Sequence, residues 1–217
     1  MKKLVTVIVA VSCLAAYQAK ATIILNMGVG DLTDQTSTLV NDNAIALIVA
    51  NTSGLGLAGG VNNLAGTSSL VVGTDLTIQG GGVGDLILGK ANITASSGLT
   101  GYWGGTSGAW PLGAQGLAAG ETVYLMWFPS LTMASTSPGA GTFYGALTNP
   151  GPLDSGEPWV IPADGSTTEL DANNANEGGT YPNGNLSANF QTVVPEPSSI
   201  LLVVTGLLGL LGLRRRS

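Results

Sequence analysis

Glycine and other turn-forming residues interrupt this chain so often that no long helix fits into its central part. The 217 residues include 33 glycines, about twice the average share of roughly 7%. Glycine weakens a helix interior because it loses more backbone entropy on folding than any other residue. Short runs rich in β-branched and aromatic residues stand between the interruptions, which is typical of β-strands. The stretch 22–193 is therefore predicted to be one all-β domain.

Nine short runs are predicted to be strands. They are 22–27, 44–50, 69–72, 75–79, 85–88, 121–128, 142–147, 159–161 and 186–193. Their length and spacing favour a β-sandwich or jelly roll. A β-solenoid is the alternative, although the sequence has no fixed repeat period. The stretch 151–185, rich in Pro, Asn and Gly, is predicted to be a loop.

One of these runs differs from the others in its pattern. In 121–128, Tyr124 and Trp127 stand beside Leu125 and Phe128 instead of alternating with polar residues. A strand with one solvated face alternates apolar and polar residues, whereas a continuous apolar run indicates burial on both faces. This run is therefore predicted to lie in the core.

The N-terminus has the three parts of a secretory signal peptide. Lys2 and Lys3 precede an apolar stretch from Leu4 to Ala16, and Ala19-Lys20-Ala21 fits the small-x-small rule of signal peptidase. Residues 1–21 are therefore predicted to be removed, so that the mature chain begins near Thr22. A retained anchor and a lipoprotein signal at Cys13 are the alternatives. The apolar stretch is short for an anchor, and the usual Leu three residues before the cysteine is absent.

The C-terminus has the sequence pattern of a stop-transfer transmembrane helix. The uncharged run 198–213 is followed by Arg214, Arg215 and Arg216. As a helix, 16 residues span about 24 Å at about 1.5 Å each, slightly less than the roughly 30 Å hydrocarbon core. Arginines next to a membrane helix favour the cytoplasmic side, which predicts a cytoplasmic C-terminus and an exported body. A buried core helix is the alternative.

Just before this run stands Pro195-Glu196-Pro197. A Pro-Glu-Pro motif, a short apolar helix and a terminal basic cluster, in that order, resemble the PEP-CTERM protein-sorting domain over residues 194–217. The resemblance implies that Pro195, Glu196 and Pro197 are recognised by an exosortase, a membrane-embedded cysteine transpeptidase. It also implies transient anchoring in the inner membrane, cutting near the motif, and delivery to the cell surface or an exopolysaccharide-containing extracellular matrix.

Removing both ends changes the charge of what remains. Between Thr22 and Pro197, Lys90 stands alone against all 13 acidic residues, a net charge of −12. Nucleic acid is excluded as a partner because no basic patch is present to neutralise phosphates. This segment also has no histidine, arginine or cysteine, which excludes disulfides, Ser-His-Asp and Cys-His nucleophile systems, and His- or Cys-ligated zinc.

Two kinds of candidate site remain. Trp103 and Trp110, in a Gly-rich stretch, could stack on sugar rings, or they could cap one end of the sandwich. The carboxylates of Glu121, Glu157, Glu169 and Asp171 could form an acid–base pair for glycan cleavage, but the sequence places no two of them together.

The sequence therefore predicts an exported surface or matrix protein, sorted by an exosortase, with no enzymatic activity of its own. It predicts no catalytic residue, metal site or cofactor. An exopolysaccharide-binding module and a carboxylate-dependent glycan enzyme are the alternatives.

Overall fold

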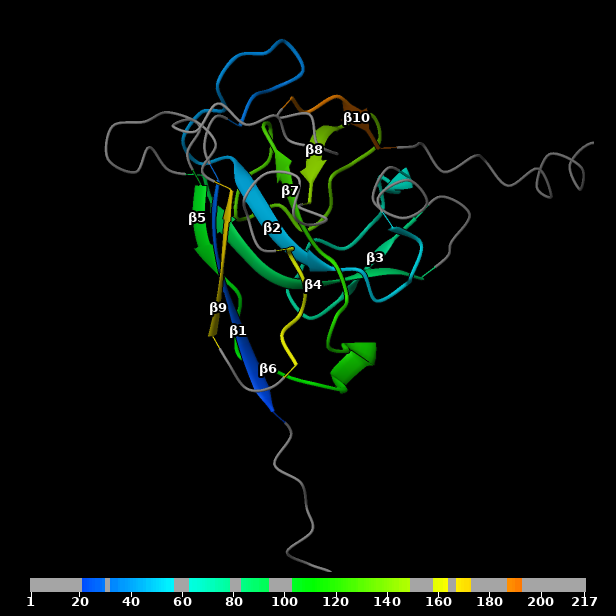
Figure 1. Ribbon diagram of the computed structural model, residues 1–217. Helices are drawn as coiled ribbons and strands as arrows, with labels where there is room; N and C mark the ends of the chain where they lie inside the picture. Colours follow the sequence, from blue (N-terminus) through cyan, green and yellow to red (C-terminus); the bar gives the residue numbers. More distant parts are fainter. Residues whose placement is uncertain are drawn as a thin grey trace, which may run out of the picture.

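The computed structural model describes residues 21–29, 32–56, 63–78, 83–93, 103–148, 158–163, 167–172 and 187–192. The predicted signal peptide up to Lys20, the sorting motif, the apolar run 198–213 and the three arginines lie outside these residues. Within the described residues the prediction of an all-β body is confirmed (Figure 1). No helix there is long and apolar enough to cross a membrane.

Six strands form the larger sheet, in the order β10-β8-β7-β2-β4-β3. Its members are β2 (Ile45–Ala50), β3 (Asp75–Thr77), β4 (Val83–Asn92), β7 (Val123–Phe128), β8 (Phe143–Leu147) and β10 (Phe190–Gln191). All the pairings in this sheet are antiparallel. Because β2 and β7 lie in the middle, their neighbours satisfy both edges of each strand.

The smaller sheet is built around β1 (Thr22–Val29). Its other members are β5 (Trp103–Thr106), β6 (Trp110–Pro111) and β9 (Thr167–Ala172). Strands β5 and β6 pair antiparallel with β1 in registers that differ by one residue, so they continue one another along the same edge. Strand β9 pairs in parallel with the other edge. A single 3₁₀ turn, Ala114–Gly116, follows β6.

The two sheets share a hydrophobic core, here called the inner core. Strand β1 alternates strictly, with Ile23, Leu25, Met27 and Val29 buried and the residues between them more exposed. These four side chains pack with residues from one face of β2, β4 and β7. The alternation is what a strand with one buried face requires.

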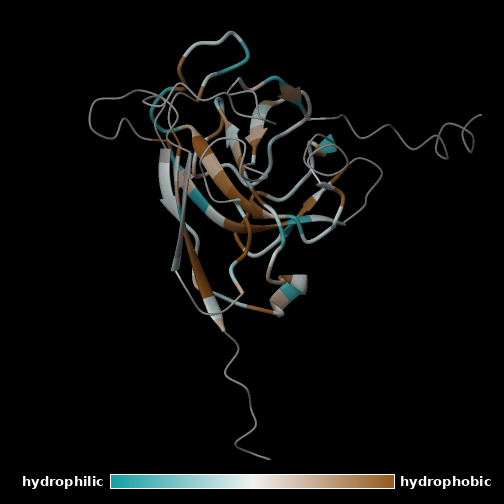
Figure 2. Cartoon of the chain, in the orientation of Figure 1, coloured by the Kyte–Doolittle hydropathy of each residue, from teal (hydrophilic) through white to brown (hydrophobic). Residues whose placement is uncertain are grey.

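A second core, here called the outer core, covers the opposite face of the larger sheet. Every residue of β2 and β7 is buried, and successive residues belong in turn to the inner and the outer core. Leu64, Leu70 and Leu76, from the segment before and within β3, cover this face together with Tyr144. Figure 2 shows β2 as apolar along much of its length. The prediction that 121–128 is buried on both faces is confirmed.

A β-bulge brings the edge of the smaller sheet against the larger one. Ile48 pairs with Gly89 and Val49 with Ile87, so Leu88 is the extra residue of β4. Its carbonyl oxygen accepts hydrogen bonds from Gly108 N at 3.2 Å and Trp110 Nε1 at 2.9 Å. A bulge leaves such a carbonyl without a ladder partner, and here the neighbouring sheet supplies the donors.

Several strand predictions need correction. The segment 69–72 is a turn, in which Ser69 and Thr74 are hydrogen-bonded to each other at 3.0 Å. The segment 159–161 forms only an isolated bridge, between Val160 and Thr122. Strand β9 lies inside the predicted loop 151–185, and β5 and β6 were not predicted. These strands are short, and β5 and β9 form on edges of β1, so their pairing depends on the tertiary fold.

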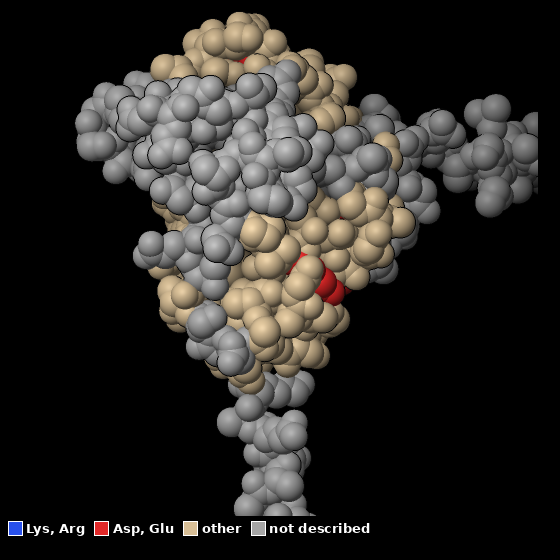
Figure 3. Space-filling model, viewed as in Figure 1, with Lys and Arg blue, Asp and Glu red and all other residues tan. Residues whose placement is uncertain are grey.

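Charged side chains are sparse on the surface. On the face seen in Figure 3, the described acidic residues appear at two separate places, and no blue atom is visible. The body's single lysine is partly buried, and its Nζ donates to the carbonyl oxygens of Met133 at 3.2 Å and Ser135 at 2.6 Å. Lys90 thus ties the loop after β7 to β4 instead of offering a cation to a partner.

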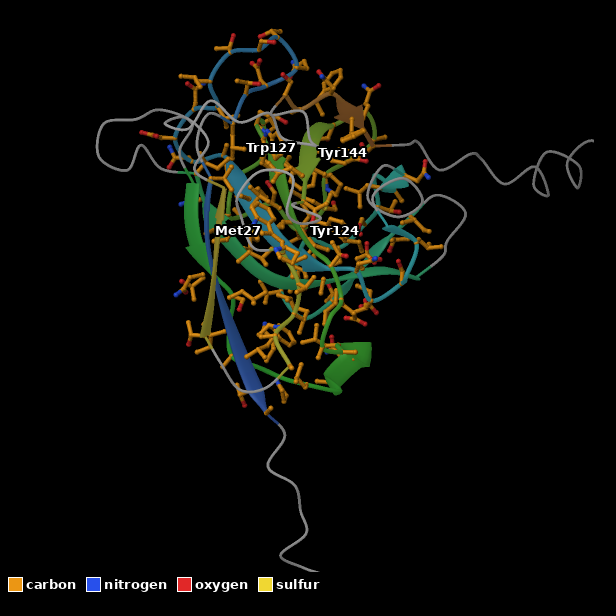
Figure 4. The ribbon with its side chains drawn as sticks, viewed as in Figure 1. Met27, Tyr124, Trp127 and Tyr144 are labelled. Atoms are coloured by element: carbon orange, nitrogen blue, oxygen red, sulfur yellow. The ribbon has the colours of Figure 1, made fainter. Side chains whose placement is uncertain are left out.

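The glycine most constrained by packing is Gly145 in β8. It pairs with Trp127, and a Cβ atom there would overlap the indole ring. The ring is also held by a hydrogen bond, since Trp127 Nε1 donates to the carbonyl oxygen of Thr33 at 3.0 Å. Figure 4 shows Trp127 and Met27 to one side of Tyr124 and Tyr144, as their assignment to the inner and outer cores requires.

Gly145→Ala is expected to lower the free energy of unfolding by about 1–3 kcal/mol, the usual cost of overpacking a core. Gly108→Ala is the matched control, because a Cβ there meets only Trp110 Nε1 at an ordinary 3.6 Å. Urea unfolding of both variants measures the difference. Equal stability of the two variants would contradict the packing argument.

Candidate functional site

The described residues bring one group of polar side chains together, at the end of the larger sheet where β2 leaves it. Ala50 pairs with Leu86 in β4 and with Val123 in β7, so Asp85, Asn51 and Thr122 lie side by side. Asp85 is 1% exposed, and its Oδ1 accepts hydrogen bonds from Ser53 N at 3.1 Å and Ser53 Oγ at 2.6 Å. Asp85 therefore holds the turn that follows β2.

Two carboxylate oxygens of this group are buried without a hydrogen-bond partner among the described residues, Asp85 Oδ2 and Glu121 Oε2. Burial raises the pKa of Asp85, and the nearby charge of Asp75 adds to the effect. Burial also raises the pKa of Glu121, with a smaller contribution from the charge of Asp85. The charge of Asp85 therefore acts on the ionisation of the Glu121 carboxyl group.

Tyr124 completes the group from the adjacent strand. Burial, and then the charge of Asp85, raise the pKa of its hydroxyl to about 12, while a hydrogen bond with Asn51 opposes the shift. The backbone of the loop is fixed at the same place, because Gly56 N donates to Asn51 Oδ1 at 3.2 Å. The group thus links the loop 51–56 to β4 and β7.

Coupled carboxyl groups with raised pKa values are the pattern of general acid–base catalysis. A catalytic carboxyl group must, however, lie within hydrogen-bond reach of the substrate. Asp85 is buried, and its one bonded oxygen is occupied by Ser53. The Asp85 carboxyl group therefore has the features of a structural clamp for the turn after β2.

The other carboxylates considered for catalysis are Glu157, Glu169 and Asp171. Glu157 lies outside the described residues. Glu169 and Asp171 are in β9, where their backbones pair with Asn26 and Gly28 of the smaller sheet. Asp85, which is essential to the group, was not among the candidates. Its only signal in the sequence is an acidic residue inside an otherwise apolar strand.

The two tryptophans considered for sugar binding lie at opposite ends of β1. Trp103 pairs with Val29 and Trp110 with Ile23, which separates their backbones by about 20 Å at about 3.3 Å per residue. Trp110 is only partly exposed and packs against the inner core. The structure therefore does not bring the two residues together as one stacking platform.

No cluster of three or more His, Cys, Asp or Glu side chains in the described part of the chain could hold a metal ion. The carboxylates that are brought together, Asp85 and Glu121, supply only two such side chains.

The C-terminal end of the body is fixed by a second polar arrangement, centred on Thr192. Its hydroxyl accepts a hydrogen bond from Thr142 N at 2.9 Å and donates to the carbonyl oxygen of Gly139 at 2.6 Å. Its backbone N–H donates to Thr142 O at 3.0 Å, and its carbonyl accepts from Gly141 N at 3.1 Å. Four hydrogen bonds thus attach Thr192, which is 3% exposed, to the turn before β8.

Comparison with known families identifies the segment that begins immediately after this residue. Residues 193–216 match the sequence model described as PEP-CTERM protein-sorting motif. No curated protein and no solved structure matches the chain. The chain therefore carries a PEP-CTERM sorting motif on an all-β body, and such a motif implies export and recognition by an exosortase. The residues Pro195, Glu196 and Pro197 lie within the matched segment.

The buried Asp85 gives the body a specific pH dependence. An acid whose pKa is raised by folding destabilises the folded state once it ionises. We compare the free energy of unfolding of the unmodified protein with that of Asp85→Asn. The unmodified value minus the variant value is therefore expected to fall as the pH rises above about 3.8, the ordinary pKa of an aspartate side chain. It then levels off above the raised pKa. Urea unfolding across this pH range measures the difference.

Asp34→Asn is the control of opposite sign. Hydrogen bonds from Thr36, and then from the backbone of Thr38, lower the pKa of exposed Asp34. The free energy of unfolding of the unmodified protein, minus that of Asp34→Asn, is therefore expected to increase as the pH rises towards 3.8. The same sign for both variants would contradict the assignment of Asp85 as a desolvated group.

The Thr192 clamp is tested by removing its hydroxyl. Thr192→Val is expected to lower the free energy of unfolding by about 1–3 kcal/mol, because Thr142 N and Gly139 O lose a buried partner. Amide exchange at Thr142 should accelerate. Thr192→Ser keeps the hydroxyl and should retain most of the protection. Unchanged exchange at Thr142 in the valine variant would exclude the clamp.

Proposed function

We propose that this chain is an exported surface or extracellular-matrix protein that an exosortase sorts through Pro195-Glu196-Pro197, and that its body has no enzymatic activity of its own. The observation that carries the proposal is the match of 193–216 to the sorting motif. It begins directly after Thr192, the last residue that the structure describes. The sorting label and the folded cargo are therefore adjacent but separate parts of the chain.

The charge distribution supports the same division. Six of the seven basic residues are Lys2, Lys3, Lys20, Arg214, Arg215 and Arg216, in the two terminal segments. Positive residues at these places favour a translocated body between a signal peptide and a cytoplasmic C-terminus. We infer that signal peptidase cuts after Ala21 and that 198–213 anchors the chain in the inner membrane until the exosortase acts.

The fold supports a passive role for the body. We infer a β-sandwich of the jelly-roll kind, and the support is that two sheets share the inner core. The carboxylate of Asp85, which is 1% exposed, holds Ser53 of the loop 51–56. The high acidity keeps such a body soluble through self-repulsion.

The test is cell fractionation with intact-mass measurement of a triple variant, Pro195→Ala/Glu196→Ala/Pro197→Ala. The unmodified protein is expected at the surface without its signal and tail. The variant should remain in the membrane fraction with the tail attached. Pro150→Ala/Pro152→Ala/Glu157→Ala removes the same residue types elsewhere and is the control, for which normal sorting is expected. Identical location and mass of the motif variant and the unmodified protein would exclude exosortase sorting through this motif.

A further inference from the structure

The end of the folded body determines which of its surfaces lies nearest the tail. Thr192 is attached to the turn 138–142, and Gln191 Nε2 donates to the carbonyl oxygen of Gly141 at 2.9 Å. The turn itself is fixed to the body, because Gly139 N donates to Gly66 O at 2.9 Å. The exit point of the tail therefore has a fixed position on the body. We call the surface formed by 137–142 and 190–192 the exit face.

The sequence limits how far this face can lie from a membrane that holds the tail. Only residues 193–197 separate Thr192 from the apolar run that begins at Ser198. Fully extended, this connection reaches about 20 Å, at about 3.3–3.6 Å per residue. The headgroup layer occupies about 5–8 Å of that distance. The exit face must therefore lie within about 15 Å of the headgroups while the tail is in place.

The exit face is also the uncharged part of an acidic body. No Asp, Glu, Lys or Arg occurs in 122–153 or in 178–195, the two segments that supply it, although residues 22–192 carry 12 acidic side chains. The loop that contains Asp34 contacts the N-terminal end of the described segment 187–192, where Ala188 N donates to Thr33 O at 3.1 Å.

We propose that the exit face is the membrane-facing surface of the body before the tail is cut, and that its occupant is the anionic phospholipid headgroup layer. Acidic side chains within about one Debye length of such a layer, about 8 Å at physiological ionic strength, would be repelled. A face supplied by segments without charged residues lies there at no such cost. The proposal rests on the membrane anchoring in the proposed function, and it adds an orientation.

Single cysteines test the orientation, because the mature chain has no cysteine of its own. Ala140→Cys lies on the exit face, and Ala119→Cys lies beyond the opposite end of β7; both positions are exposed. The mature chain with its tail is labelled with an environment-sensitive fluorophore and reconstituted in phosphatidylglycerol vesicles containing a headgroup-spin-labelled lipid. Quenching is expected to be about twofold stronger, or more, at position 140 than at 119, since spin-label quenching requires close approach.

The outcomes separate the two proposals. Protein that does not float with the vesicles contradicts membrane anchoring, and with it the orientation. Protein that floats but is quenched equally at both positions, or more at 119, overturns the orientation alone. Quenching at 140 that appears only after an exosortase is added would assign the exit face to a protein partner and overturn the lipid assignment.

A charge variant tests why this face is neutral. The reporter is placed at exposed Ser137→Cys, and Ala140→Asp adds a negative charge beside it. In phosphatidylglycerol vesicles at low salt, Ala140→Asp is expected to reduce the quenching by about half or more. Ala119→Asp should leave it unchanged, and neither should act in phosphatidylcholine vesicles. An equal effect of Ala140→Asp in both lipids, or none in either, would overturn the electrostatic explanation.

Discussion

Burial of β2 and β7 on both faces is the constraint on which the rest of the structure depends. Their sequences, Ile45–Ala50 and Val123–Phe128, are apolar in both registers apart from the hydroxyl of Tyr124 and the indole N–H of Trp127. Each strand must therefore be central in its sheet, and each face of that sheet must be covered. The smaller sheet covers one face, and the segment leading into β3 covers the other with Leu64, Leu70 and Leu76. The two hydrophobic cores are a direct consequence.

Glycine contributes space both within the larger sheet and where the two sheets meet. Gly145 leaves room for the Trp127 indole across β8. Gly89, beside the bulge in β4, allows close approach of β5, since a Cβ there would lie 3.2 Å from both Ser107 Cα and Thr106 O. The bulge adds an unpaired carbonyl at Leu88 that the smaller sheet uses. The high glycine content therefore serves close packing as well as turns.

Polar groups inside this body hold loops in place. Asp85 fixes the turn after β2, Lys90 fixes the loop after β7, and Thr192 fixes the last segment to the turn before β8. Each of the three contacts joins residues that are more than 30 positions apart, so each closes a long loop in a body that has no disulfide. The single lysine and the buried aspartate of the body are thereby engaged internally. The two segments that supply the exit face have no charged residue.

The sequence by itself determined the all-β class, the positions of β1, β2, β4, β7 and β8, and the sorting motif at the C-terminus. These follow from local patterns: glycine content, runs of β-branched residues, and a motif of adjacent residues. The tertiary structure alone decided that 167–172 is a strand and 69–72 a turn, that Asp85 meets Ser53, and that Trp103 and Trp110 are apart. These depend on which strand edges are left free and which side chains meet across the sheets. No local pattern encodes this, because pairing partners lie tens of residues apart along the chain.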